Sequence, residues 1–356
     1  MDSHLDRLAK KRGICLTRPS PDNVEVPITD ATKLKVLAAL GVYGKSGHRP
    51  LKKQRSKAVL KSYLPDVLEM ERLWGISLQL YELRSSRNWG IGDFADLAEM
   101  IRLAHSLGAD FVGLNPLHAP FLADPDRCSP YEPSNRQMLN PLYIAVDQVA
   151  GFQTTPEVER QLQELRLTDL VDYVRVAEVK LAALRMLWQS RHASASGSTD
   201  RDGFEDFIQD RGQVLRPHAL FETLSAVMGS SGNATGWKSW PPEFQRPDSV
   251  EVTDFAEAHA DTIRFHMWLQ WLAHLQLSGT IKVAKDAGLR IGLYFDLAVG
   301  EAIDGSATWS ERNAYISDAT VGSPPDPFAM EGQDWHLAAF IRWRLRWANM
   351  PRIGGW

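Results

Sequence analysis

The sequence has few cysteines, no long apolar run and no excess of either charge. Only two of its 356 residues are cysteines, Cys15 and Cys128. Two cysteines cannot build a disulfide framework in so long a chain, and they are too few for a structural zinc site. Their scarcity predicts a reducing, cytoplasmic location. No stretch of about 18 apolar residues occurs, which argues against a membrane-spanning helix.

The charge balance excludes a further class of protein. The 40 basic residues and 44 acidic residues give a formal net charge of −4. Because no basic excess exists to neutralise phosphates, the chain is not a nucleic-acid binder that works by bulk charge. The Met1–Asp6 segment is polar, so we expect no signal peptide. The G-x-G-x-x-G, P-loop, H-E-x-x-H and G-x-S-x-G motifs are also absent.

Tryptophan, in contrast, is abundant. The chain contains 12 Trp residues within a composition that is 44% hydrophobic and 24% charged, as in folded globular proteins. Trp side chains either fill large cores or stack on flat ligands such as sugars and bases. Burial in the core is the more common use for any single Trp. A length of 356 residues corresponds to one large domain or two ordinary ones.

The middle of the chain has the pattern of an α/β protein. Residues 76–81 alternate between apolar and polar side chains, which predicts a strand. Asp93 stands where a helix N-cap belongs, apolar residues follow at helical spacing to residue 104, and Gly108 suits the helix end. Residues 110–114 predict a second strand. Strand, helix and strand in this order form a βα unit that leads into the next strand.

The remaining segments of the chain complete this interpretation. Residues 115–141 carry six prolines and predict a long loop, and residues 156–278 are mostly helical in pattern. The run 289–299 is apolar except for Asp296 near its end, which favours a parallel strand buried on both faces. Residues 300–335 then predict a loop, and residues 337–349 predict a final helix. A polar, basic stretch at 44–61 is typical of a linker.

Several separated motifs stand along the chain. They are LQLYELRSSRNWGIGDF at 78–94, GADFVGLNPLH at 108–118, SPY at 129–131, NPLY at 140–143, DLAVG at 296–300, DGSATW at 304–309, PPD at 324–326 and GQDW at 332–335. Over roughly residues 70–350 they resemble, in the same order, the motifs of the amylomaltase-type 4-α-glucanotransferases, glycoside hydrolase family 77.

The resemblance implies an α/β fold, namely the first strands of a TIM (β/α)8 barrel that is incomplete in this chain. It also implies a helical insertion at about 152–280, a partial barrel over 71–356, and a short helical N-terminal segment with linker over 1–70. The implied activity is transfer of α-1,4-glucan segments between maltodextrins with retention of configuration. No metal or organic cofactor is implied.

Retention requires two carboxyl groups about 5 Å apart, one a nucleophile and the other an acid and then a base. In the family the nucleophile is the Asp of an R-I-D-H segment on a later strand, and the acid/base Glu lies further downstream. Here Arg352 and Ile353 are followed by Gly354. We therefore expect no catalytic residue within this chain, with the nucleophile and acid/base beyond residue 356, and we interpret the chain as an N-terminal fragment.

By motif match, seven residues are expected to bind substrate. Tyr131 suits stacking against a sugar ring, and Asp326 and Trp335 match a loop that closes over substrate in the family. Asp304 matches an acidic position that binds sugar hydroxyls. Asp296 is either a ligand to a hydroxyl or a partner for backbone donors at the strand end. Asn115 and Ser129 complete the set, whereas Asp93 is assigned to helix capping and Cys128 to no chemistry.

Two alternatives stay open at this point. The chain could be a non-catalytic remnant that binds maltodextrin, or half of a split enzyme completed by a second, C-terminal chain. A gene remnant that does not fold is a further possibility. All of these involve a maltodextrin or α-1,4-glucan partner at most, with no role for nucleic acid or a membrane.

Overall fold

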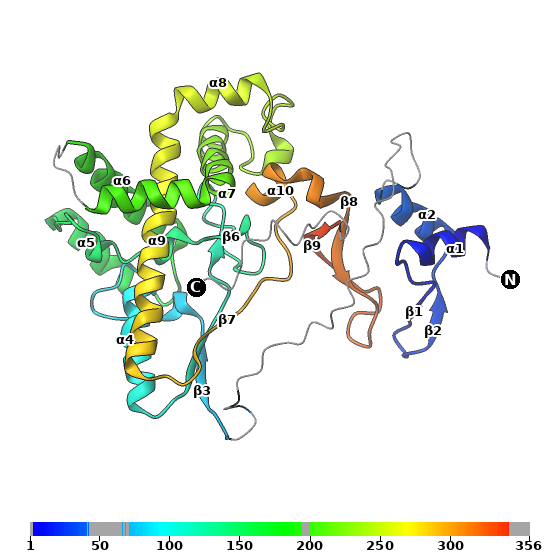
Figure 1. Ribbon diagram of the computed structural model, residues 1–356, viewed down its shortest axis with the longest axis horizontal. Helices are drawn as coiled ribbons and strands as arrows, with labels where there is room; N and C mark the ends of the chain where they lie inside the picture. Colours follow the sequence, from blue (N-terminus) through cyan, green and yellow to red (C-terminus); the bar gives the residue numbers. More distant parts are fainter. Residues whose placement is uncertain are drawn as a thin grey trace. The chain divides into compact units, whose positions relative to one another are not determined.

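The computed structural model describes residues 3–40, 42, 66, 68, 71–193 and 199–341. The chain divides into two compact units (Figure 1). The larger unit is built from Leu64–Val299 and Asp304–Ser310. The smaller unit is built from Met1–Tyr63, Gly300–Ile303 and Glu311–Gly355.

A three-stranded parallel sheet positions the candidate site in the larger unit. It consists of β3 (Gly75–Leu78), β4 (Phe111–Leu114) and β7 (Gly292–Phe295), in the order β3-β4-β7. Leu78, Leu114 and Phe295 lie level with one another, so the carboxyl ends of the three strands meet at one edge. The three strands predicted from the sequence therefore belong to one parallel sheet, as expected for an α/β fold.

The helix between β3 and β4 begins and ends where the sequence predicts. α4 (Phe94–Ser106) is capped by Asp93, whose carboxylate accepts hydrogen bonds from the backbone N–H groups of Ala95 and Asp96. Asp96 completes a capping box by accepting from the N–H of Asp93. Gly108 has a φ of +84°, the left-handed conformation that favours glycine after a helix. The assignment of Asp93 to capping is confirmed.

A block of helices lies between β6 and β7 in the chain. It contains α5 (Pro156–Arg166), α6 (Tyr173–Ala193), α7 (Thr199–Ser230), α8 (Val250–Ala258) and α9 (Ala260–Ala287). The mostly helical pattern expected for residues 156–278 is confirmed, and α7 continues through Pro217. α8 and α9 meet at His259. None of the helices in the described ranges combines the length and apolar character needed to cross a bilayer.

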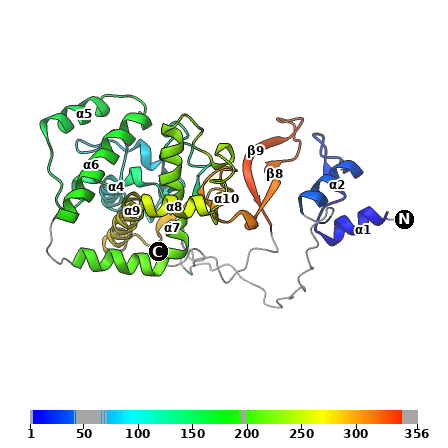
Figure 2. The same ribbon diagram turned by 90° about the horizontal axis from the view of Figure 1, so that it is seen from above.

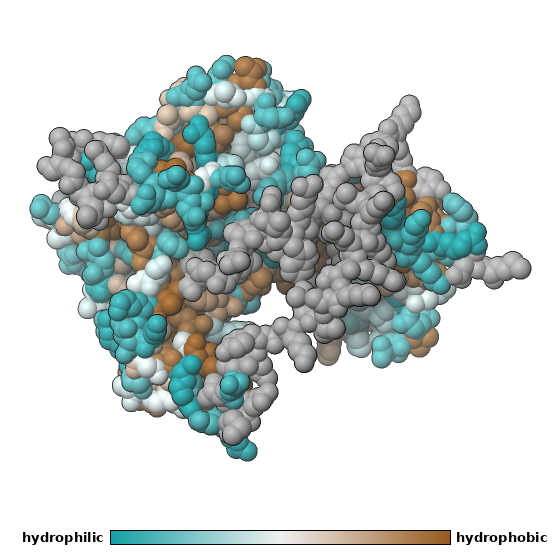
Figure 3. Space-filling view, in the orientation of Figure 1, coloured by the Kyte–Doolittle hydropathy of each residue, from teal (hydrophilic) through white to brown (hydrophobic). Residues whose placement is uncertain are grey.

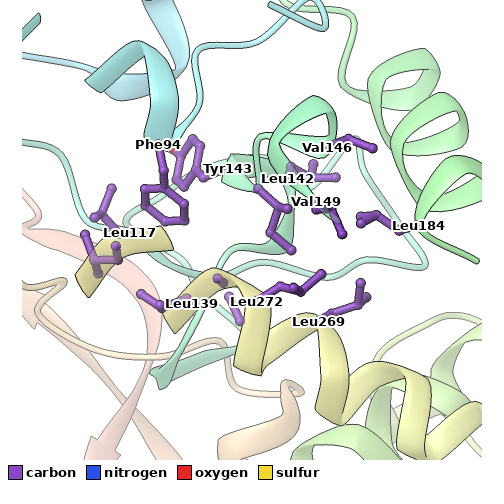
Figure 4. Packing of buried hydrophobic residues seen from close by; sticks show 14 of the residues in the cluster. Phe94, Leu117, Leu139, Leu142, Tyr143, Val146, Val149, Leu184, Leu269 and Leu272 are labelled. Atoms are coloured by element: carbon purple, nitrogen blue, oxygen red, sulfur yellow. The ribbon is translucent and has the colours of Figure 1, made fainter. Parts of the chain in front are cut away.

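The core of the larger unit lies where α9 meets the sheet and the other helices. α9 packs against α4 and α7, and Figures 1 and 2 both show α4 beside α9. Leu269 and Leu272 of α9 face Leu142, Val146 and Val149 in this core (Figure 4). The core interpretation holds for most of the described Trp residues: those buried are Trp89, Trp188, Trp237, Trp240, Trp268, Trp271 and Trp309.

The proline-rich segment after β4 is more ordered than the sequence indicates. It contains the short antiparallel pair β5 (His118–Ala119) and β6 (Asn135–Leu139), where a continuous loop was expected. Short 3₁₀ turns occur at η1 (Leu80–Glu82), η2 (Pro141–Tyr143), η3 (Val146–Gln148), η4 (Trp237–Ser239) and η5 (Arg312–Ala314). The five-residue helix α10 (Ser306–Ser310) follows β7.

The smaller unit differs more from the predictions. It contains α1 (His4–Lys11), the hairpin β1 (Thr17–Pro19) and β2 (Glu25–Pro27), α2 (Asp30–Ala39), and the hairpin β8 (Tyr315–Ser323) and β9 (Gln333–Phe340). The helices α1 and α2 were expected, but the segments 17–27 and 300–335 were interpreted as loops. The helix expected from residue 337 is wrong for 337–340, which belong to β9, and the rest of it lies outside the described residues.

Other sequence-based interpretations also fall outside the described residues. These are the linker at 44–61 and the segment 350–356. A polar break was expected at 194–203; residues 194–198 lie outside the described part, whereas 199–203 belong to α7, so the break is wrong there.

The burial expected for β7 is wrong. Its large apolar side chains, and those just after it, are open to solvent: Tyr294 is 61% exposed, Phe295 37%, Leu297 51% and Val299 61%. In Figure 3, apolar surface is visible over the part of the larger unit where β3 and β7 lie in Figure 1. Among the described strands, β7 pairs on one side only, with β4.

Candidate functional site

The candidate site lies at the carboxyl edge of the β3-β4-β7 sheet. Gln79, Asn115 and Asp296 each follow directly after one of these strands. The parallel register therefore places the three polar residues along one edge, which is where α/β proteins position binding and catalytic side chains. The backbone N–H of Asp296 donates to the carbonyl of Leu114, which ties the end of β7 to that of β4 at 3.2 Å.

Tyr131 reaches this edge from the long segment after β4. The Asp296 carboxylate and the Gln79 side chain lie close enough to its hydroxyl to shift the pKa of the phenol. Partial desolvation, followed by the negative charge of Asp296, raises the pKa of the Tyr131 phenol. The side chain of Tyr131 is nevertheless 49% exposed. The structure therefore brings together Tyr131 and Asp296, two of the residues singled out by the sequence.

Two residues beside this pair, His118 and Arg136, were not predicted from the sequence to belong to the site. His118 accepts a 3.4 Å hydrogen bond from the backbone N–H of Ala298 at Nε2, and Arg136 donates to the carbonyl of Ala298 at 2.8 Å. Burial, followed by the charge of Arg136, lowers the pKa of His118 to about 4, so its imidazole is neutral at pH 7. Both lie on the β5–β6 pair and fix the chain just beyond Asp296.

Asn115 is a buried residue of the site, and its side chain is hydrogen-bonded inside the protein. It is only 3% exposed, and its side-chain carbonyl accepts the backbone N–H of Leu80 at 2.8 Å. Its side-chain amide donates to the Pro116 carbonyl at 2.9 Å and to the Tyr143 hydroxyl at 3.2 Å. The Asn115 side chain therefore links the ends of β3 and β4 through contacts inside the protein.

Ser129 and Asp304 lie in the same unit but have different surroundings. Ser129 is exposed, and its hydroxyl accepts a 3.3 Å hydrogen bond from the backbone N–H of Tyr131, which shapes the turn that carries the tyrosine. Asp304 is half-buried, and both of its carboxylate oxygens accept hydrogen bonds from Arg127, at 3.0 and 3.1 Å. Arg127 could not be identified as a site residue from the sequence, because its partner Asp304 lies far along the chain.

Asp326 and Trp335 belong to the smaller unit. Asp326 shapes the turn between β8 and β9, where Oδ1 accepts the N–H groups of Phe328 at 2.7 Å and Ala329 at 2.8 Å. Trp335 lies on β9, is 41% exposed, and donates its indole N–H to Gln333 at 2.9 Å. Near this turn Phe328 is fully exposed. Both residues therefore lie on one hairpin that presents apolar surface to solvent.

The chemistry available at the strand edge is that of polar-ligand binding. An exposed aromatic ring provides an apolar face, while Asp296 and Gln79 provide hydrogen-bonding groups beside it. Within the described parts of the chain, no three His, Cys, Asp or Glu side chains gather in a way that could hold a metal ion. Cys128, on the same segment as Tyr131, is a free, exposed thiol, and Cys15 is likewise free.

A family comparison and two curated relatives agree with one another. A sequence model described as 4-alpha-glucanotransferase matches residues 78–349. A 4-alpha-glucanotransferase of Haemophilus influenzae is 36% identical over 294 residues, which are 78% of this chain and 42% of that protein. One from Mycobacterium tuberculosis is 34% identical over 287 residues, 76% of this chain and 38% of that protein. The chain thus spans about two fifths of the length of these relatives.

Solved structures show the same fold. Amylomaltase from Corynebacterium glutamicum superposes with a TM-score of 0.72 at 23% identity, covering 94% of this chain and 60% of that one. Amylomaltase from Streptococcus agalactiae, solved in complex with acarbose, gives a TM-score of 0.63 at 19% identity, covering 76% of this chain and 53% of that one. The α/β architecture is therefore that of the amylomaltases.

Proposed function

Because the chain belongs to the 4-alpha-glucanotransferase family, glycoside hydrolase family 77, we propose that it forms the substrate-binding N-terminal part of such an enzyme. The proposed reaction transfers an α-1,4-glucan segment from one maltodextrin to another with retention of configuration. The observation that supports this assignment is the Tyr131–Asp296 pair at the strand edge. An aromatic face next to a carboxylate suits a pyranose ring, which is apolar on its faces and carries hydroxyl groups around its rim.

Seven residues are assigned to substrate binding in this proposal. Tyr131 stacks on a sugar ring, and Asp296 and Asp304 accept hydrogen bonds from sugar hydroxyls. Asp304 retains acceptor capacity because a carboxylate offers about four lone-pair positions and Arg127 occupies two of them. Ser129 and Asn115 support the site, while Asp326 and Trp335 contribute from the β8–β9 hairpin. The nucleophile and the acid/base are assigned to none of the 356 residues.

The proposal extends to the fold and to a partner. We interpret β3, β4 and β7 as the first strands of a (β/α)8 barrel, with residues 71–356 as a partial barrel, about 152–280 as its helical insertion and 1–70 as a separate N-terminal segment. A barrel of this type needs eight strands. A complementing C-terminal chain would supply the others, and the exposed side chains of β7 support this idea. The free cysteines fit a cytoplasmic location.

Calorimetric titration with maltoheptaose tests the binding role. We expect saturable binding with an affinity that weakens at least about fivefold in Tyr131→Ala, since aromatic stacking contributes about 1 kcal/mol or more. Tyr294→Ala is the matched control, because Tyr294 is also an exposed tyrosine of this unit but lies on β7 itself. Equal affinity of both variants would contradict the assignment of Tyr131.

Turnover is tested separately with maltotriose. We expect no glucose release from this chain alone, and release after mixing with the part of the Haemophilus influenzae relative that the chain does not match. Glucose release by the chain alone would instead show that catalytic carboxylates lie within its 356 residues. Binding without release in the mixture would favour a non-catalytic maltodextrin-binding protein.

A further inference from the structure

The segment that carries Tyr131 is fastened to the residues around α10 at two points. At its far end, the hydroxyl of Ser134 accepts the backbone N–H of Ser306 at 2.9 Å, and the carbonyl of Ser134 accepts the N–H of Ala307 at 3.1 Å. Asn135 donates to the hydroxyl of Ser306 at 2.9 Å. Gly305 packs so closely on Ser134 that no side chain would fit there. This end of the segment is held by backbone and side-chain atoms of Ser134 and Asn135 together.

The near end is held by one side chain, Arg127. Its guanidinium binds both carboxylate oxygens of Asp304 and also Glu132, at 2.9 Å, on the far side of Tyr131 in the same segment. The guanidinium carbon lies 3.6 Å from the centre of the Phe121 ring, within the range of a cation–π contact. A planar guanidinium is well suited to bind several partners at fixed angles, which an ammonium group cannot do.

Asp304 is in turn fixed in place. Its backbone carbonyl accepts the N–H of Trp237 at 3.1 Å, and its side chain packs against Gly236, where no other residue would fit. The Phe121 ring meets Phe221 edge-on at 6.3 Å, and Phe221 packs on Trp240 and Trp309. Arg127 thus connects the exposed segment to a buried aromatic cluster through both Asp304 and Phe121.

We propose that Arg127 is the positioning residue of the candidate site, which holds residues 127–134 in the conformation that directs the Tyr131 hydroxyl to Asp296. Tyr131 lies between the two fastening points, and the bond from Arg127 to Glu132 closes the segment around it. The ion pair also orients the Asp304 carboxylate. The proposal rests on the binding function proposed above, but its structural part is measurable without any sugar.

Hydrogen exchange of the Arg127→Gln protein tests the structural part. We expect the backbone N–H groups of residues 128, 129, 131 and 132 to exchange at least about tenfold faster than in the unsubstituted protein, because charge-assisted hydrogen bonds are lost. Arg160→Gln is the matched control, since Arg160 also binds two carboxylates, Glu157 and Glu164, but on the exposed face of α5. Unchanged exchange at residues 128, 129, 131 and 132 would overturn the proposal.

Maltoheptaose affinity tests the link to binding. We expect Arg127→Gln to weaken binding about tenfold and Arg127→Lys to restore little of it, since a point charge cannot replace the bidentate contact. Asp304→Asn combined with Arg127→Gln should add less than the sum of the single changes. Full affinity in a protein with faster exchange would also overturn the proposal. If the unsubstituted protein does not bind maltoheptaose, the proposed function fails, and the exchange result alone decides the role of Arg127.

Discussion

Glu222 and His218 face each other one turn apart on α7, with 4.0 Å between Oε1 of the glutamate and Nδ1 of the histidine. Both side chains are only 2% exposed. Burial raises the pKa of Glu222 to about 8 and lowers the pKa of His218 to about 3. Both groups are therefore neutral at pH 7, and the contact is not an ion pair. The histidine instead shares a 2.8 Å hydrogen bond with Ser306.

The raised pKa of Glu222 predicts a pH-dependent stability. The folded protein holds this proton up to about pH 8, whereas the unfolded chain releases it near the ordinary value of 4.5. The contribution is thus fully present below about pH 4.5 and is lost as the pH rises through 8. Relative to Glu222→Gln, the free energy of unfolding should fall by up to about 1.4 kcal/mol per pH unit. Urea unfolding of both proteins at pH 5 to 8 measures this, and parallel pH profiles would refute it.

Arg87 provides the clearest prediction about stability. Its guanidinium contacts Asp93 at 2.9 Å, Asp96 at 2.8 Å and Asp147 at 2.5 Å, and the first two carboxylates are almost completely buried. Removing it in Arg87→Ala leaves these carboxylates without their cation, which should cost about 3 kcal/mol. Arg160→Ala also breaks two ion pairs, but exposed ones that solvent screens, and should cost far less than Arg87→Ala. Urea midpoints at pH 7 compare the two, and similar losses would contradict the prediction.

Asn115 and Tyr131 should separate stability from binding. Asn115→Leu leaves the buried N–H of Leu80 without its acceptor and should lower the free energy of unfolding by about 2 kcal/mol. Tyr131→Ala changes a half-exposed side chain and should alter it by no more than about 0.5 kcal/mol, while weakening maltoheptaose binding. Thermal unfolding alongside calorimetric titration tests both. A large loss of stability in Tyr131→Ala would mean that the tyrosine is a structural anchor.

His336 predicts a stabilising substitution in the β8–β9 hairpin. Its φ of +55° lies in the left-handed region, which a residue with a Cβ occupies at a cost of about 1 kcal/mol. His336→Gly should therefore raise the free energy of unfolding by up to about 1 kcal/mol, whereas His336→Val should lower it. Denaturant titration decides, and a destabilised glycine variant would show that the imidazole itself contributes.

The sequence predicted the parts of the fold that depend on local patterns. The β3, β4 and β7 strands and the Asp93 cap follow from periodicity and capping chemistry, which act over a few residues. The β8–β9 hairpin was missed because Ser, Asp, Thr and Gly interrupt the apolar residues of Tyr315–Ser323, so no regular apolar alternation marks it. The apolar run at 337–340 has no signal that distinguishes a short strand from a helix.

The candidate site shows the same division. Tyr131 and Asp296 were identified from motifs. The parallel register explains why the ends of β4 and β7, which are far apart in sequence, lie side by side. Arg127 was not identified, because its meaning depends on Asp304, which is 177 positions away. The partners of Asn115, including the Tyr143 hydroxyl, likewise emerge only when the chain folds. Motifs located Tyr131, Asp296 and the buried Asn115, but they did not reveal the long-range contacts that hold them in place.

The open side of β7 has a practical consequence for anyone who purifies this protein. Among the described strands none pairs with the second side of β7, and a strand edge that carries large apolar side chains is a template on which another molecule can add a strand. Concentrated solutions should therefore aggregate by edge-to-edge pairing. Because natural sheets protect such edges with charge, a lysine in place of Leu297 should keep the protein monodisperse at concentrations where the unsubstituted chain precipitates.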